Sequence, residues 1–325
     1  MSRKKKMHYS GIGGQAVLEG IMMKNKDQYA VAVRKPDGEI EVEIEHYIGV
    51  LHDSKLKNIP FIRGMFQFLD SMILGMRSLN FSAAFYEDEE AQETVTDKAF
   101  HKLFKDKADQ ALSAIVMVIS LALAIGIFMV LPYFVTSLFF EYIRSTSFMA
   151  IIEGVMRIAI FVLYVLSISL MKDIRRLYRY HGAEHKCINC IEHGMDLNVE
   201  NVMESSKQHK RCGTSFLLIV MLISVVLFLF IRVESPLWRV IVRILLVPVI
   251  AGISYEFIRL AGRSENRVVE ILSKPGLWMQ NLTTKEPDES MIEVAICSVE
   301  AVFDWKAYLT ENFGKHYEEE RREKP

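Results

Sequence analysis

The residues best suited to chemistry lie together near the middle of the chain, at His181, Glu184 and His185. Their spacing, H-x-x-E-H, is that of inverted zincins, in which two histidines on one helix face bind Zn²⁺ and the glutamate activates water. Residues four apart adjoin on a helix, so both rings could reach one ion. Because water bound to such an ion ionises near neutral pH, the spacing predicts metal-assisted hydrolysis with Glu184 as general base.

A catalytic zinc site takes a third protein ligand besides these two histidines. The nearest candidates that follow the motif are Glu200, Glu204, His209 and Cys212. Spacing does not choose among them, and the predicted ligand set keeps Glu200, His209 and Cys212. The expected cofactor is Zn²⁺ or another divalent metal.

Two other interpretations of this segment stay open. Cys187 and Cys190 form a C-x-x-C pair, and with Cys212 and neighbouring histidines they could bind a structural zinc ion. A redox role for the pair is disfavoured because no thioredoxin-like βαβ pattern surrounds it. In the remaining interpretation no metal is bound, and these side chains are polar groups satisfied by their neighbours at a helix junction near a membrane.

The chain that positions these residues has 325 residues, of which 51% are hydrophobic, with 39 basic and 40 acidic side chains. This composition excludes a disordered or collagen-like protein. A net charge of -1 gives no whole-chain electrostatic basis for binding nucleic acid, which needs a surplus of Lys and Arg on one surface. We therefore expect no nucleic-acid partner.

Four apolar stretches are long enough to cross the hydrocarbon core of a membrane, which takes about 20 helical residues. The first, 111–140, contains no charged residue and no histidine. The others are 148–171, 212–231 and 237–260, and the last of them holds three arginines and a glutamate. We predict an integral membrane bundle of four transmembrane helices.

The orientation follows from the basic residues of the connecting loops. Eight Lys and Arg residues lie in the loop 172–211, whereas the connections 141–147 and 232–236 are short and carry one Arg each. By the positive-inside rule the long loop stays in the cytosol. No cleavable signal peptide is visible in the first hundred residues. We expect both termini to be cytosolic.

The cytosolic segments contain strand patterns. Residues 28–47 alternate around a Pro-Asp-Gly turn and predict a hairpin. The alternation at 291–299 predicts a C-terminal strand in the same small sheet. The glycine-dense segment 11–20 lacks the pattern of a phosphate loop, which favours tight backbone packing. The expected fold is therefore a four-helix membrane bundle with a small cytosolic α+β domain.

The segment 60–81 places Phe, Met, Leu and Ile at helical spacing opposite polar residues and predicts an amphipathic helix. It could lie in the membrane interface or pack against the hairpin domain, and both options stay open. The predicted order of segments is an N-terminal hairpin segment (1–59), this helix with a charged linker (60–110), two transmembrane helices (111–171), a basic loop with the His, Glu and Cys cluster (172–211), two further transmembrane helices (212–260) and a C-terminal cytosolic segment (261–325).

Two ionisable residues lie at matching depth in the predicted spans. Glu153 is six residues from the outer end of the second span, and Arg243 is six residues from the outer end of the fourth, so each is about 9 Å deep. Charged groups are costly there unless they are paired. We predict an intramembrane ion pair between them, with Arg157 nearby. No internal repeat is visible, which favours a structural pair over a transport pathway.

Four dispersed blocks resemble a bacterial family known as domain of unknown function 1385. They are GGQAVLEGIMM at 13–23, YHGAEHK at 180–186, RCGTSF at 211–216 and GISYE at 252–256. The resemblance covers roughly residues 11–299. It implies a multi-pass membrane protein that is sometimes described as a predicted metal-dependent enzyme. The site it implies consists of His181, Glu184 and His185 with Glu200, His209, Arg211 and Cys212. Lys210 departs from the expected proline, and Cys187 and Cys190 are not part of the resemblance.

Two functions are compatible with these features. In the first, the protein is a metal-dependent hydrolase of the bacterial cytoplasmic membrane that acts on a peptide or lipid-linked substrate at the cytosolic face. In the second, it is a non-catalytic accessory subunit of a membrane machine such as the protein export and insertion channel. The basic loop 172–211 and the helix 60–81 suit a partner surface or anionic lipid equally well. Membrane lipids are expected partners in both cases.

Overall fold

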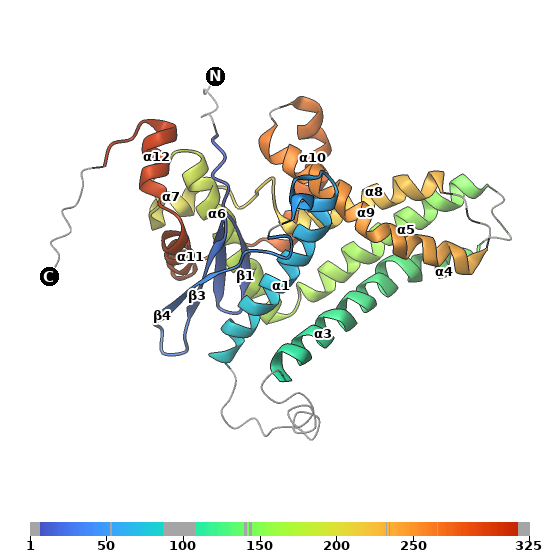
Figure 1. The fold of residues 1–325 in the computed structure, drawn as a ribbon, viewed down its shortest axis with the longest axis horizontal. Coiled ribbons are helices and arrows are strands. Elements are labelled where there is room, and N and C mark those ends of the chain that lie inside the picture. Colours follow the sequence, from blue (N-terminus) through green and yellow to red (C-terminus); the bar gives the residue numbers. More distant parts are fainter. Residues whose placement is uncertain are drawn as a thin grey trace. The chain divides into compact units, whose positions relative to one another are not determined.

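The computed structural model describes residues 7–52, 54–86, 108–139, 142, 145–231, 233, 235–264 and 266–317. The chain forms two compact units, each drawn from separate stretches of sequence (Figure 1). We call the first the α/β unit; it comprises Met1–Gly49, Lys172–His209 and Gln280–Pro325. We call the second the helical unit; it comprises Val50–Met171 and Lys210–Met279. The charged linker predicted before residue 110 lies largely outside the described residues.

The α/β unit contains an antiparallel sheet of four strands in sequence order, β1 (Gly13–Val17), β2 (Gly20–Asn25), β3 (Gln28–Arg34) and β4 (Ile40–His46). Tight turns join neighbouring strands. Val17 pairs with Gly20 and Asn25 pairs with Gln28, so two residues close each of the first two turns. The hairpin predicted at 28–47 is confirmed as β3 and β4.

The strands β1 and β2 have no counterpart in the predicted fold, because their sequence hides the strand pattern. Glycines weaken the signal of β1, and β2 is buried on both faces over its first four residues, so polar and apolar residues do not alternate. Tight packing of this segment is confirmed at Gly20, where an added Cβ atom would lie 2.4 Å from the main-chain oxygen of Ala32.

Two helices, α6 (Lys172–Glu192) and α11 (Glu289–Val302), contact the sheet and each other and form a layer on one face of it (Figure 1). The short helix α7 (Val199–Glu204) packs on both, and α12 (Trp305–Phe313) ends the described part of the unit. The core between the layers contains Ile21, Met23, Ala30 and Ala32 of the sheet, Ala183, Cys187 and Ile191 of α6, and Ile292, Ala295 and Val299 of α11.

The predicted C-terminal strand at 291–299 is wrong, because these residues form most of α11. Asp288 caps the helix by accepting a hydrogen bond from the main-chain nitrogen of Met291 at 3.1 Å. Burial in this segment follows helical spacing and not strand alternation: Ala295 would face the solvent with Glu293 in a strand, yet it is fully buried. The small domain is therefore built from the N-terminal sheet, the helices of 172–209 and the C-terminal helices.

The helical unit contains four helical stretches that are long and apolar enough to cross a membrane, as predicted: Ala114–Ser137, Phe148–Ile168, Gly213–Phe230 and Leu237–Arg263. The first is built from α3 (Ala108–Ile125), a π-helical turn η3 (Gly126–Val130) and α4 (Leu131–Ser137). The others are α5 (Thr146–Ile168), α8 (Gly213–Phe230) and α9 (Pro236–Arg263). Helix α8 packs against both α5 and α9, and α4 packs against α5 (Figure 1).

The predicted amphipathic helix is confirmed as α1 (Ile62–Ala84), which follows a short 3-10 helix, η1 (Lys55–Asn58). It packs against α9, where Arg63 Nε donates to Glu256 Oε1 at 2.6 Å. Arg63 Nη2 contacts the other carboxylate oxygen, Oε2, so the two side chains form a two-point ion pair. The last helix that begins in this unit is α10 (Arg267–Thr283). A position of α1 in the membrane interface stays a prediction.

Candidate functional site

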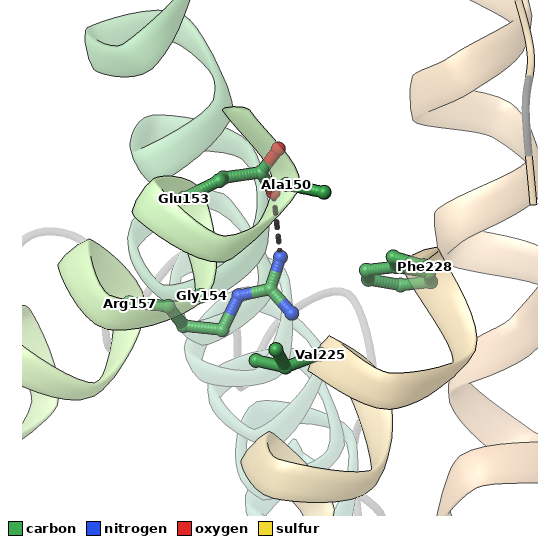
Figure 2. Close-up of a pocket in the computed structure, with 6 residues that line it drawn as sticks. All are labelled: Ala150, Glu153, Gly154, Arg157, Val225 and Phe228. Atoms are coloured by element: carbon green, nitrogen blue, oxygen red, sulfur yellow. Dashed lines mark hydrogen bonds and ion pairs between the residues drawn. The ribbon is translucent and has the colours of Figure 1, made fainter. Parts of the chain in front are cut away.

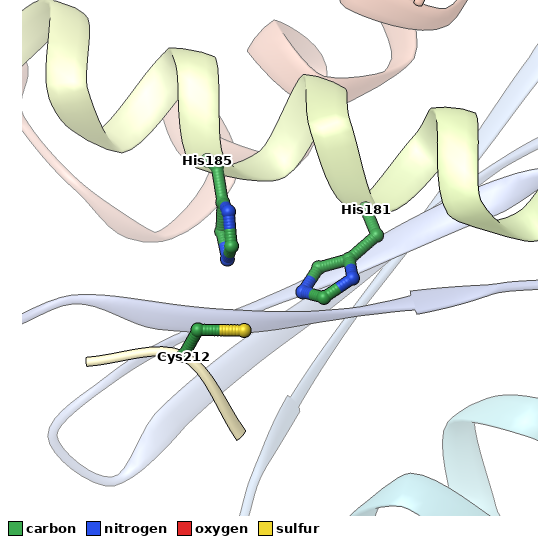
Figure 3. Close-up of side chains that lie close together, drawn as sticks. All are labelled: His181, His185 and Cys212. Carbon is green, nitrogen blue, oxygen red and sulfur yellow. The ribbon is translucent and has the colours of Figure 1, made fainter. Parts of the chain in front are cut away.

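The histidines of the H-x-x-E-H motif lie one turn apart on α6 in the α/β unit. Figure 3 shows His181 and His185 projecting from the same side of the helix. Their ring centroids are 4.4 Å apart. The helix is buried from Gly182 to its end, so its rigid packing holds the pair in this arrangement. The spacing in the sequence therefore translates into two adjacent imidazoles.

Each imidazole is oriented by a main-chain carbonyl. His181 Nδ1 lies 3.0 Å from the oxygen of Thr283, and His185 Nδ1 lies 2.7 Å from the oxygen of Lys207. A carbonyl oxygen can only accept, so Nδ1 must carry the proton in both rings. In the neutral ring the lone pair is then on Nε2. Metal-binding histidines in proteins commonly show this arrangement, in which the second nitrogen donates to a carbonyl or carboxylate.

A third histidine, His209, lies beside the pair within the same unit. Its ring centroid is 5.7 Å from that of His185. Its main chain is held by Gln280, which accepts from the nitrogen at 2.8 Å and donates to the oxygen at 2.7 Å. His209 Nε2 lies 3.4 Å from the carboxylate of Glu192. The ring is therefore directed toward an acidic partner as well as toward the histidine pair.

Glu192 is a residue that the sequence motifs do not indicate. It is fully buried at the end of α6, seven residues after His185 and thus two turns further along the same helix. Its Oε1 atom accepts from the main-chain nitrogen and the hydroxyl of Ser10, at 2.9 and 2.7 Å. A search for carboxylates at whole helical turns from the histidines could have found it. The α/β unit thus brings these three histidines together with the buried carboxylate of Glu192.

The other predicted site residues are distributed differently. Glu184 is buried on α6 next to His185, and its side chain lies against Gly14 of β1, where an added Cβ atom would be 3.0 Å from Glu184 Cγ. Glu200 is exposed in the first turn of α7. Cys212, which Figure 3 also draws, belongs to the helical unit, where its sulfur accepts from the main-chain nitrogen of Thr214 at 3.4 Å and caps α8.

The cysteines of the C-x-x-C pair lie in the hydrophobic core of the α/β unit. Cys187 is fully buried, and Cys190 directs its sulfur at the main-chain oxygen of Asp196, 3.3 Å away. Burial raises the pKa of Cys187 well above its usual value and that of Cys190 to about 12. Both thiols are packed in the core and Cys190 donates to a carbonyl, so this surrounding favours a packing role over a thiolate zinc site.

Gly182 allows a main-chain segment to cross the motif. An added Cβ atom at this position would lie 2.0 Å from the main-chain oxygen of Lys285. The nitrogen of Lys285 donates to the oxygen of Tyr178 at 2.9 Å, which fastens the crossing segment to α6. Thr283, whose oxygen orients His181, lies two residues earlier in this segment. The glycine therefore permits the contact that fixes one of the two imidazoles.

A second cluster of ionisable residues lies inside the helical unit. Glu153 of α5 contacts Arg243 of α9, with Arg243 Nη1 2.6 Å from Glu153 Oε1 and Nη2 2.7 Å from Oε2. Arg157, one turn further along α5, donates to the same carboxylate at 2.9 Å and to the hydroxyl of Ser224. All three charged side chains are buried.

The fold and the histidine cluster define a class of protein: a bundle of helices able to cross a membrane, joined to a compact α/β unit with buried histidines. The chain belongs to the family described as "Protein of unknown function (DUF1385)", whose pattern matches residues 59–305. It is also 34% identical over 310 residues to the "Uncharacterized protein YqhQ" of Bacillus subtilis (strain 168), an alignment that covers 92% of this chain and 94% of the relative. No solved structure matches the chain.

Proposed function

We propose that this protein is a multi-pass membrane protein whose α/β unit binds a divalent transition metal through Nε2 of His181 and of His185. The observation that carries the proposal is the paired contact of the two Nδ1 atoms with main-chain carbonyls, because it directs both lone pairs to Nε2 on one side of one helix. Imidazole nitrogen suits zinc and its neighbours in the first transition series far better than magnesium or calcium.

The third ligand is the open choice within this proposal. His209 is adjacent to His185, but its Nε2 faces Glu192, which suits it to an orienting role. Cys212 follows His209 by three residues in the sequence and supplies a sulfur, a donor that zinc accepts readily. Glu200 is exposed and is the weakest of the three candidates. All three residues stay in the proposed ligand set.

Hydrolysis is the reaction that this set of residues suits best. When bound, the metal would lower the pKa of a water molecule toward neutrality. Glu184, adjacent to His185 and buried, would take the proton from that water and pass it to the leaving group. The proposed substrate is a peptide or a lipid-linked compound, since both can be presented at a membrane surface to a unit attached to the bundle.

The substitution Glu184→Gln tests the role of Glu184 as general base without removing a proposed metal ligand. The amide has nearly the same shape but cannot accept a proton, so we expect turnover to fall by roughly 10²- to 10⁴-fold while metal content stays at the wild-type level. The measurement is hydrolysis of peptide and lipid-linked substrates by detergent-purified protein, with metal content determined on the same sample. Equal turnover of the variant and the wild type would exclude Glu184 as the base.

We propose that the four apolar helices cross the bacterial cytoplasmic membrane with both termini in the cytosol, which places the α/β unit on the cytosolic side. The basic residues of 172–211 support this orientation. A phosphatase reporter that is active only outside the cytosol, fused to the C-terminus, should be inactive, and a fluorescent reporter that folds in the cytosol should be bright. The opposite pair of signals would reverse the orientation.

A further inference from the structure

The buried cluster of the helical unit carries more positive than negative charge. Among the described residues, Glu153 is its one carboxylate, whereas Arg157 and Arg243 both contact it. The three residues are 5, 2 and 8% exposed. The fourth polar member, Ser224, is neutral and accepts from Arg157. An excess of one positive charge is therefore enclosed among α5, α8 and α9.

This excess lies in an unfavourable place for an unpaired cation. Arg157 is nine residues beyond Phe148, so it lies about 14 Å along a stretch that is apolar enough to cross a membrane. Aromatic rings moderate the charge: the guanidinium carbons of Arg157 and Arg243 lie 5.1 and 4.9 Å from the ring centroid of Phe228. A ring face attracts a cation but does not neutralise it, so a counter-charge is still needed.

Arg157 also retains a donor for such a counter-charge. Its two terminal nitrogens donate to Glu153 and Ser224, but among the described residues Nε, which is buried, has no hydrogen-bond partner. A buried donor without a partner is costly, and structures usually supply one. Figure 2 shows the guanidinium between Glu153, Val225 and Phe228.

A small cavity adjoins this guanidinium. It is lined by Ala150, Glu153, Gly154, Arg157, Val225 and Phe228 and has a volume of about 10 Å³ (Figure 2). This volume is at the lower limit for one water-sized ligand, so a halide ion, which is larger than water, would displace the lining side chains slightly, and sulfate or phosphate would not fit. Water could satisfy Nε, but only an anion would also balance the charge.

We propose that this cavity binds a monovalent anion of halide size, with Arg157 as its principal partner. Arg243 contributes attraction at longer range, because its guanidinium is shared with the same carboxylate. Glu153 has two opposing effects: it holds the arginines in place, and its charge repels the anion. Its neutralisation should therefore strengthen anion binding.

The test is the thermal unfolding of the full-length protein in mild detergent, in sodium chloride, bromide, sulfate or gluconate at equal ionic strength. Wild-type protein should show a saturable rise of Tm with chloride and bromide over gluconate, because a ligand of the folded state stabilises it by mass action. The Tm in sulfate should equal the Tm in gluconate. Glu153→Gln should unfold at lower temperature than the wild type in gluconate and reach half-saturation at a roughly tenfold lower chloride concentration.

Arg157→Gln should abolish the chloride response, and Arg63→Gln, which breaks an ion pair elsewhere in the same unit, should keep it. If Arg157→Gln does not fold, the Glu153→Gln series still decides, because its chloride response has a predicted direction. Equal Tm values in all four salts for both the wild type and Glu153→Gln would overturn the proposal and show that the cavity holds water alone.

Discussion

Purified protein in which both His181 and His185 are replaced by alanine is expected to contain no bound metal, whereas the wild type contains about one ion per chain. The two rings supply the proposed nitrogen ligands. Even the loss of a residue that only hydrogen-bonds to a metal ligand typically lowers metal affinity by roughly 10- to 100-fold. Removing two ligands together should therefore reduce the metal content to background. Elemental analysis of detergent-purified protein measures this directly.

The matched control for this variant is His193→Ala. His193 follows the same helix, and its Nδ1 also lies against a main-chain carbonyl, that of Asn189 at 2.8 Å. It differs by lying two full turns beyond His185, outside the pair of adjacent rings. This variant should keep the wild-type metal content. If the double variant retained metal as well, ligands other than the two histidines would have to bind it.

Gly182→Ala is expected to damage both the stability of the α/β unit and its affinity for zinc. The new methyl group would lie 2.0 Å from the main-chain oxygen of Lys285, so the main chain around Lys285 or around Gly182 has to move. Overpacking a closed interior usually costs about 1–3 kcal/mol, and we expect the upper end here because the obstructing atom belongs to the backbone. The displaced segment includes Thr283, so His181 would lose its orienting carbonyl and zinc affinity should fall by roughly 10- to 100-fold.

Chemical denaturation and zinc titration of the same preparation measure the two effects of Gly182→Ala. The matched control is Gly13→Ala in the same unit, because no atom lies within 4 Å of a Cβ atom added at that position. That variant should resemble the wild type in both measurements. An unchanged unfolding midpoint and zinc affinity in Gly182→Ala would show that the crossing segment yields easily and does not fix His181.

The membrane-type helices were the most predictable part of the fold. Residues 111–140 contain no charge at all, and no other element of a globular chain requires such a stretch. The strand prediction at 291–299 was wrong because a short alternation of apolar and polar residues is compatible with a strand. It is equally compatible with a helix that is buried along most of its length. Burial on both faces likewise removed the alternation that would have revealed β2.

The candidate site was predictable as far as local spacing reaches. Helical geometry alone places His181 beside His185. The carbonyls of Thr283 and Lys207 were not predictable, since every residue carries a carbonyl and only the fold decides which one faces an imidazole. The same holds for the charge excess in the helical unit. Equal depth suggested a contact between Glu153 and Arg243. That Arg157 Nε has no hydrogen-bond partner within the described part of the chain depends on the packing around it.

X-ray absorption at the zinc edge of the wild-type protein tests the central proposal most directly. A coordination shell with two imidazole nitrogens at about 2.0–2.1 Å, and one sulfur at about 2.3 Å if Cys212 is the third ligand, is the predicted result. A shell of sulfur alone would assign the metal to cysteines. Absence of stoichiometric metal even after reconstitution with zinc would contradict the metal site and favour a non-catalytic accessory of a membrane machine such as the protein export channel.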